Sequence, residues 1–164
     1  GYSTASYATD ISPPYFGVSY SGGTNGAGFV YEVTHLTGTG HSDLQVIYNF
    51  CSRSNCADGG NPASNILQMP DGSLVGTTSS GGSGAGTIFV LTPSQLGAGI
   101  WDETTAFTFC TYWEDCGHFG YPIGGLSLIG PSLIMGSVSN GPSARGELYT
   151  YDLSAHIWTA YTNW

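Results

Sequence analysis

Short runs in which hydrophobic and polar residues alternate, separated by glycine-rich turns, follow one another along the chain. The clearest runs are residues 28–34, 86–92 and 146–152, and each has an aromatic residue near its centre. Alternation over about five to eight residues is typical of β-strands that bury one face. No stretch keeps an apolar period of about 3.6 residues, so the pattern predicts an all-β protein with at most one turn of helix, near residues 93–96.

The alternating runs belong to a longer pattern that occurs three times. The segments GVSYSGG (17–23), GTTSSGG (76–82) and GSVSNG (136–141) lie at offsets of 59 and 60 residues, and each precedes one of the runs. A further strand-like segment ends in an aromatic residue at 45–50 and again at 104–109. Both of these segments are followed at once by a pair of cysteines. Such self-similarity at a fixed period indicates a repeat architecture.

The repeat predicts three units of about 60 residues, each with about four short antiparallel strands arranged like a propeller blade. The fourth strand is expected at 64–67 in the first unit and at 125–128 in the second. The turn signal Asp71-Gly72 joins it to the first strand of the next unit. Residues 1–164 thus form a single repeat domain, whose approximate units are 14–70, 71–130, and 131–164 together with 1–13.

The two ends of the chain are out of phase with these units. A candidate fourth strand at 5–11 precedes the first unit, whereas the last unit ends in a third strand at 156–164. We therefore predict that residues 1–12 pair with the C-terminal unit, either in the same chain or head-to-tail in the next molecule. Three blades are fewer than the four to eight of typical propellers. A compact pseudo-threefold β-barrel or trefoil-like body is the alternative fold.

The second unit carries a resemblance to a known family. The segment DGSLVGTTSSGGSGAGTIFVLTPS (71–94), preceded by YNFCSRSNCADGGNPASNI (48–66), resembles the GloVer-type tandem repeat of bacterial exported proteins. The resemblance covers roughly residues 14–152 and is weaker in the first and third units. It implies four-stranded, propeller-like blades on an extracellular protein, and it brings no set of catalytic residues.

The composition excludes several classes of protein. Aromatic residues make up 13% of the chain and charged residues only 8%, which is unlike a disordered protein. With two arginines, no lysine and a net charge of −9, the chain lacks the cations that a nucleic-acid partner requires. The longest apolar runs, such as residues 88–91, are far shorter than the roughly 20 residues of a membrane span.

The four cysteines form two close pairs, Cys51 with Cys56 and Cys110 with Cys116. Four thiolates could hold zinc, but zinc ligand pairs usually have two to four residues between them and sit on tight knuckles, whereas here the gaps are four and five residues and no knuckle pattern surrounds them. Free or cross-paired thiols are a further alternative. One disulfide within each pair is favoured, because both pairs occupy the same position of the repeat. Disulfides indicate an oxidising compartment, so we expect an extracellular or cell-surface protein.

The eleven acidic residues offer few candidates for catalysis. A glycosidase needs two carboxylates held about 5–9 Å apart across the scissile bond. The adjacent acids Asp102 and Glu103, and Glu114 and Asp115, each lie next to a tryptophan. Neither pair recurs in the other units, however, and both fall in predicted turns or loops. We therefore expect no catalytic residues.

Asp58 is the one candidate ligand for a metal. In the turn Asp58-Gly59-Gly60-Asn61, carboxylate and carbonyl oxygens could surround calcium. The spaced acidic ligands of strong calcium sites are missing, so an aspartate that hydrogen-bonds its own turn is the favoured interpretation. No other metal or cofactor is expected.

Several aromatic residues fall in or near the second cysteine loop and the third strands. Exposed rings at such places can stack on sugars or contact a partner subunit, and the alternative is that they pack over the sheet edges. The candidates are Trp101, Tyr112, Trp113, Phe119, Tyr121 and Trp158.

Together these features predict a non-catalytic extracellular protein that assembles with copies of itself, as in a surface fibre. The alternative function is a glycan-binding, lectin-like module that uses the aromatic loops. A secreted glycoside hydrolase is the third and least favoured hypothesis.

Overall fold

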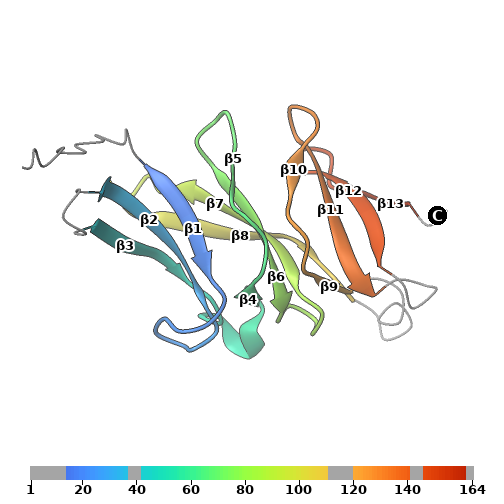
Figure 1. Ribbon diagram of the computed structural model, residues 1–164, viewed down its shortest axis with the longest axis horizontal. Helices are drawn as coiled ribbons and strands as arrows, with labels where there is room; N and C mark the ends of the chain where they lie inside the picture. Colours follow the sequence, from blue (N-terminus) through green and yellow to red (C-terminus); the bar gives the residue numbers. More distant parts are fainter. Residues whose placement is uncertain (1–13, 37–41, 111–119, 141–145, 162–164) are drawn as a thin grey trace, which may run out of the picture.

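In the computed structural model, residues 14–36, 42–110, 120–140 and 146–161 are described. These residues form thirteen strands and no α-helix; a single 3₁₀ turn, η1, covers Ser54–Cys56 (Figure 1). The predicted all-β class is therefore confirmed. The strands are β1 (Tyr15–Ser19), β2 (Phe29–Leu36), β3 (Ser42–Asn49), β4 (Gly60–Pro62), β5 (Leu67–Gln68), β6 (Leu74–Ser80), β7 (Thr87–Pro93), β8 (Trp101–Thr108), β9 (Gly120–Pro122), β10 (Ser127–Leu128), β11 (Leu133–Asn140), β12 (Glu147–Asp152) and β13 (Ile157–Tyr161).

The strands build three separate antiparallel sheets. The first sheet has the order β1-β2-β3; in the second, β4 and β5 both pair with β6, which continues to β7 and β8. In the third sheet, β9 and β10 pair with β11, which continues to β12 and β13. The sheets lie in a row, with the first and third at opposite ends and the second between them (Figure 1). Among the described strands no sheet closes on itself, so the alternative of a closed barrel is wrong.

The fourth strand predicted at 64–67 is wrong in its bounds: two short strands stand there instead, and only the second contains a predicted residue, Leu67. In the middle sheet these are β4 and β5, and both lie antiparallel to β6. Between β4 and β5 the Ala63 N–H still donates to the Thr77 carbonyl at 3.1 Å, but the Thr77 N–H donates to the Ser64 hydroxyl at 2.9 Å in place of a backbone carbonyl, which interrupts the ladder.

After β5 the chain turns at Asp71 and Gly72, where Gly72 has a φ of 85° and the Asp71 carboxylate accepts a hydrogen bond from the Ser73 N–H at 3.0 Å. The predicted Asp-Gly hairpin between β5 and β6 is thereby confirmed.

The pairing of these short strands corrects the expected phase of the units. The strands that follow a cysteine loop pair with the sheet that comes next in the chain, so each sheet is continuous in sequence. The C-terminal sheet accordingly contains the same five kinds of strand as the middle sheet. The expectation that the C-terminal unit lacks a fourth strand, which residues 1–12 would supply, is therefore wrong. The candidate strand at 5–11 and the predicted pairing of residues 1–12 lie outside the described residues.

Each sheet contains a glycine opposite an aromatic residue. The aligned pairs are Gly17 with Tyr31 (β1 and β2), Gly76 with Phe89 (β6 and β7), and Gly136 with Tyr149 (β11 and β12). In all three pairs a Cβ on the glycine would overlap the aromatic ring. The ring therefore lies across the neighbouring strand, directly over the backbone that the glycine leaves bare.

This arrangement predicts unequal effects of alanine at equivalent glycines. Because Phe89 is fully buried, Gly76→Ala leaves its ring no room to move and should destabilise the protein by about 2–3 kcal/mol. Tyr31 is only half-buried, so in Gly17→Ala its ring can move outward and the loss should be smaller. Urea denaturation of the two variants measures the difference, and equal losses would contradict the proposed role of burial.

Candidate functional site

Apolar faces of the sheets make up the contacts between the sheets and the two ends of the row. Between the first and second sheets, Val30 and Phe50 pack against Leu74, Phe89 and Leu91, and all five side chains are fully buried. The rings of Phe50 and Phe89 meet edge to face with centroids 4.9 Å apart, a favoured geometry for aromatic pairs. The aromatic residue that follows β3 thus covers the aromatic residue on β7.

The second and third sheets meet in the same manner. Phe109, which follows β8, packs edge to face on Tyr149 of β12 with centroids 5.6 Å apart. Trp158 of β13 stacks on Tyr149 at 4.4 Å and on Phe107 of β8 at 4.7 Å. We call these two contacts between sheets the first and second layers. In both layers, an aromatic residue that follows the last strand of one sheet packs on the aromatic ring that pairs with glycine in the next sheet.

The backbone reinforces the likeness of the two layers. The Asn61 N–H at the start of the middle sheet donates to the Ala27 carbonyl of the first sheet's hairpin at 2.6 Å. The Tyr121 N–H at the start of the third sheet donates to the Ala85 carbonyl of the middle sheet's hairpin at 2.8 Å. Asn61 and Tyr121 both have a positive φ, of 53° and 57°. The two junctions are therefore alike in packing, hydrogen bonding and backbone conformation.

The first sheet has an outer face on which no other described sheet packs. We define the receiving face by Tyr15, Tyr31, Val33, Leu44 and Val46, which align across β1, β2 and β3. Tyr15, Leu44 and Val46 are 48%, 51% and 39% exposed. In the middle sheet, Leu74 and Leu91 hold the corresponding positions beside the pair of Gly76 and Phe89. Both side chains are fully buried.

The third sheet has an apolar outer face at the other end of the row. We define the presenting face by Leu133, Met135, Leu148, Ile157 and Tyr161, which lie opposite the side of this sheet that contacts the middle sheet. Ile157 and Tyr161 are 59% and 50% exposed. The row of sheets therefore ends in an exposed apolar face on both sides.

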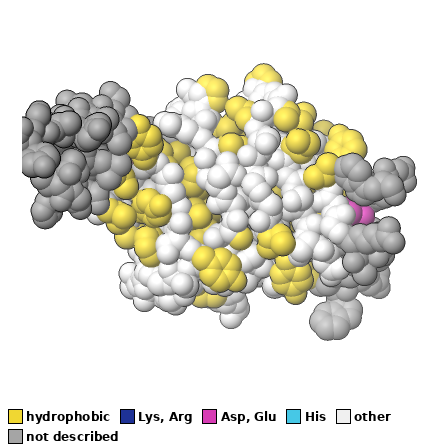
Figure 2. Space-filling model, in the orientation of Figure 1, with side chains coloured by type: hydrophobic (Ala, Val, Ile, Leu, Met, Phe, Trp, Pro, Cys, Tyr) yellow, Lys and Arg dark blue, Asp and Glu magenta, His cyan; other side chains and the backbone are white. Residues whose placement is uncertain are grey.

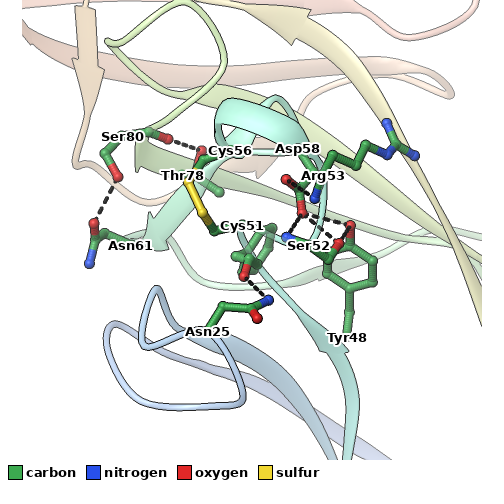
Figure 3. The surroundings of a disulfide bond; sticks show 11 residues. Asn25, Tyr48, Cys51, Ser52, Arg53, Cys56, Asp58, Asn61, Thr78 and Ser80 are labelled. Atoms are coloured by element: carbon green, nitrogen blue, oxygen red, sulfur yellow. Dashed lines mark hydrogen bonds between the residues drawn. A yellow bond between two sulfur atoms is a disulfide. The ribbon is translucent and has the colours of Figure 1, made fainter.

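The first cysteine loop stands at the junction of the first two sheets (Figure 3). Cys51 and Cys56 form a disulfide, as predicted, so zinc coordination by this pair is wrong. Cys110 is also disulfide-bonded, and its predicted partner, Cys116, lies outside the described residues. The Gly82 N–H donates to the Cys56 carbonyl at 2.8 Å, which ties the loop to the hairpin of the middle sheet.

Asp58 organises the cysteine loop from a fully buried position. Its carboxylate accepts hydrogen bonds from the Ser52 N–H and hydroxyl and from the Tyr48 hydroxyl, each at 2.9 Å, and from the Arg53 N–H at 3.2 Å (Figure 3). Burial acts to raise the pKa of Asp58, but these donors outweigh it and hold the pKa below its ordinary value. The loop itself thus satisfies the carboxylate, and calcium at Asp58 stays a prediction.

Glu103 of β8 is engaged in the first inter-sheet layer. Its buried carboxylate lies 2.9 Å from the Arg53 guanidinium and accepts a hydrogen bond from the Thr105 hydroxyl at 3.0 Å. Burial raises the pKa of Glu103, against the opposing effects of Thr105 and Arg53. Asp102, its neighbour in the candidate pair, is exposed, and the second candidate pair, Glu114 and Asp115, lies outside the described residues. Sequence reasoning missed the Arg53–Glu103 ion pair, because the partners are 50 residues apart.

The structure places the candidate aromatic residues in different settings. Trp101 packs edge-on against Phe16 at 5.6 Å, and Trp158 belongs to the stacked layer described above, so both rings join sheets within the chain. Tyr121 is exposed at the start of the third sheet. The remaining candidates, Tyr112, Trp113 and Phe119, lie outside the described residues.

A cavity of about 590 Å³ opens between the second and third sheets. Its lining combines apolar side chains, among them Met69 and Val90, with serine and threonine hydroxyls and the His156 ring. The Tyr151 hydroxyl donates to the Ala106 carbonyl at 2.7 Å, so at the 3.0 Å contact with His156 it accepts a hydrogen bond from the Nδ1–H. Nε2 of the neutral ring is then a hydrogen-bond acceptor. Nothing in the sequence indicated this cavity.

Comparisons with protein-family models, with curated proteins and with solved structures find no match for this chain. Within the described residues, no helix is long and apolar enough to cross a membrane. The same part of the chain contains no group of three or more His, Cys, Asp or Glu side chains that could hold a metal. Function is therefore inferred from the geometry and chemistry of the chain alone.

The hydrogen bonds to Asp58 predict a loss of stability that depends on pH. Asp58→Asn should lower the free energy of unfolding at pH 7 by about 2 kcal/mol, because it removes the charged acceptor. Since the pKa of Asp58 is lowered in the folded protein, the stabilisation is present above the carboxyl's ordinary pKa and is lost as the pH falls through the folded value. The difference between wild type and variant should shrink in acid.

Urea denaturation at pH 7 and at pH 2.5 measures this difference. Asp43→Asn, which alters an exposed carboxylate on β3, is the matched control and should change little at either pH. A deficit in Asp58→Asn that stays constant between the two pH values would show that the carboxylate's charge is unimportant.

Proposed function

We propose that this protein is a non-catalytic extracellular subunit that assembles with copies of itself. In this proposal the three sheets are successive copies of one unit, each similar to a propeller blade, and resemble the GloVer-type repeat. The glycine-aromatic pair found in every sheet and the likeness of the two inter-sheet layers support a common unit. The disulfide between Cys51 and Cys56 fits an oxidising compartment.

The observation that carries the proposal is the contrast between the outer and inner faces. Tyr15 on the receiving face is 48% exposed, whereas Leu74 and Ile134, each two residues before the paired glycine of its own sheet, are fully buried. The same kind of side chain is therefore present at the end of the row as inside it. Contiguous exposed apolar faces mark interaction sites.

The distribution of charge also favours assembly through the ends of the row. No residue that defines the receiving face is charged, and among the aligned residues on the presenting side of β11, β12 and β13 only Asp152, which pairs with Leu133 and Ile157, is charged, although the chain carries a net charge of −9. Hydrophobic and uncharged polar side chains cover nearly all of the described surface seen in Figure 2. A contact between the two faces would consequently bring few like charges together.

Self-assembly is tested by light scattering coupled to size-exclusion chromatography and by negative-stain microscopy. The wild-type protein should exceed the 17.1 kDa of one chain and grow with concentration. Val46→Arg should weaken association on the order of 100-fold, because a contact would bury an unpaired charge. Leu96→Arg alters a residue that is 83% exposed in the turn before β8, and it should associate like wild type. A wild-type chain that stays monomeric at all concentrations would exclude this function.

The cavity between the second and third sheets supports glycan binding as a second candidate function. Hydroxyl groups, an acceptor nitrogen on His156 and apolar side chains in one hollow fit a ligand that has both hydroxyls and C–H faces, such as a hexose. Trp101 and Trp158 are partly buried in contacts between sheets, so this proposal rests on the cavity and not on these two rings.

A glycan array followed by calorimetry tests the second function. If the cavity binds a sugar, Thr104→Trp should fill it and reduce affinity at least tenfold, whereas Thr24→Trp, in the exposed turn after β1, should bind like wild type. The hypothesis fails if the wild-type protein binds no glycan on the array, or if Thr104→Trp leaves affinity unchanged.

A further inference from the structure

We infer that copies of this chain join head-to-tail, with the presenting face of one molecule packed on the receiving face of the next in the manner of the two inter-sheet layers within the chain. This inference rests on the proposed assembly function and adds to it the identity of the two surfaces that meet. It concerns only the described sheets.

Both layers within the chain have the same polarity. We call the side of a sheet that carries the paired glycine and aromatic residue its glycine-aromatic side. In each layer the glycine-aromatic side of the later sheet contacts the earlier sheet, so that Phe89 faces the first sheet and Tyr149 faces the second. The equivalent side of the first sheet, with Gly17 and Tyr31, therefore faces away from the rest of the chain. It is the only glycine-aromatic side among the described sheets that has no sheet packed on it.

The other side of each sheet supplies the covering residues. Leu148 immediately precedes Tyr149 on β12, as Ile88 precedes Phe89 on β7 and Val30 precedes Tyr31 on β2. Ile88 and Val30 are fully buried against the following sheet. Leu148 occupies the corresponding place on the presenting face, on which none of the described sheets packs.

Neighbouring positions extend this correspondence across the presenting face. Met135 precedes the paired glycine of its strand, as the buried Val75 does in the middle sheet. Tyr161 pairs with Leu148 across the strands, as Phe107 pairs with Ile88, and Phe107 packs within the second layer. The presenting face therefore carries large apolar side chains where the middle sheet places its covering residues.

The structure disfavours contacts between two identical faces. In each layer within the chain, the glycine-aromatic side of one sheet packs on the opposite side of its neighbour. No described layer joins two glycine-aromatic sides or two opposite sides. The receiving and presenting faces also lie at opposite ends of the row (Figure 1), so one chain does not bring them together by itself. A contact between unlike faces leaves one free face of each kind, so it continues as a filament unless the rotation closes a ring.

Two variants, each blocked on one face, distinguish the possible modes of contact. Val46→Arg blocks the receiving face and keeps the presenting face, whereas Ile157→Arg blocks the presenting face and keeps the receiving face. Both side chains are exposed, and circular dichroism and thermal melting should show that each variant folds like wild type. Mass is measured by light scattering for each variant alone and for an equimolar mixture.

Head-to-tail packing predicts that each variant alone is monomeric and that the mixture forms a dimer of one copy of each, with no larger species. Native mass spectrometry of the mixture identifies the composition, because the two variants differ in mass. Leu96→Arg should assemble like wild type. Adding either blocked variant should shorten the Leu96→Arg assemblies, since no further copy can join the blocked face.

Other outcomes separate the inference from the function on which it rests. If wild type assembles but one variant dimerises by itself and the mixture forms no mixed dimer, identical faces meet and the head-to-tail inference is wrong, while self-assembly stands. Wild-type assembly that survives both substitutions would place the contact elsewhere on the molecule. A monomeric wild-type chain would overturn the function and the inference together.

Discussion

The structure depends on an aromatic ring laid across a glycine of the adjacent strand. At Gly76 the missing side chain allows the Phe89 ring to lie flat against the sheet, so that Phe50 from the preceding sheet reaches it edge-on. Tyr149 is placed by Gly136 in the same way and receives Phe109. A side chain at either glycine would lift the ring and separate the two sheets. The contact therefore fixes the geometry within each sheet and the spacing between sheets at once.

Because the sheets pack face to face, each one depends on its neighbours for stability. A sheet of a few short strands buries enough apolar surface only when a face is covered. The middle sheet is covered on both sides, by the first and third sheets. Among the described sheets, the first and third have a neighbour on one side only, and Leu44 at one end of the row and Ile157 at the other are exposed. Exposed ends are thus a direct consequence of stacking, and they give the molecule its candidate interaction surfaces.

Polar groups at the sheet junctions act on shape rather than on chemistry. Asp58 holds the first cysteine loop through four hydrogen bonds, and Arg53 extends from that loop to Glu103 on the next sheet. A buried carboxylate is costly unless it is paired, and here Asp58 accepts hydrogen bonds within its loop while Glu103 forms an ion pair with Arg53. These acids therefore join the loop to the sheets, and neither is presented to a substrate.

The sequence by itself determined the strands, because alternation, the Asp71-Gly72 turn and the spacing of glycine and aromatic residues are local signals. It also indicated the bond between Cys51 and Cys56, which lie five residues apart. Only the tertiary structure decided that β4 and β5 join β6, since either edge of a neighbouring sheet offers the same backbone groups. The ion pair of Arg53 with Glu103 and the ring contacts of Trp158 also arise from stacking, which brings together residues that are distant in the chain. The open ends follow from that same stacking, because which face of each sheet is covered is settled by packing between sheets and not within any one strand.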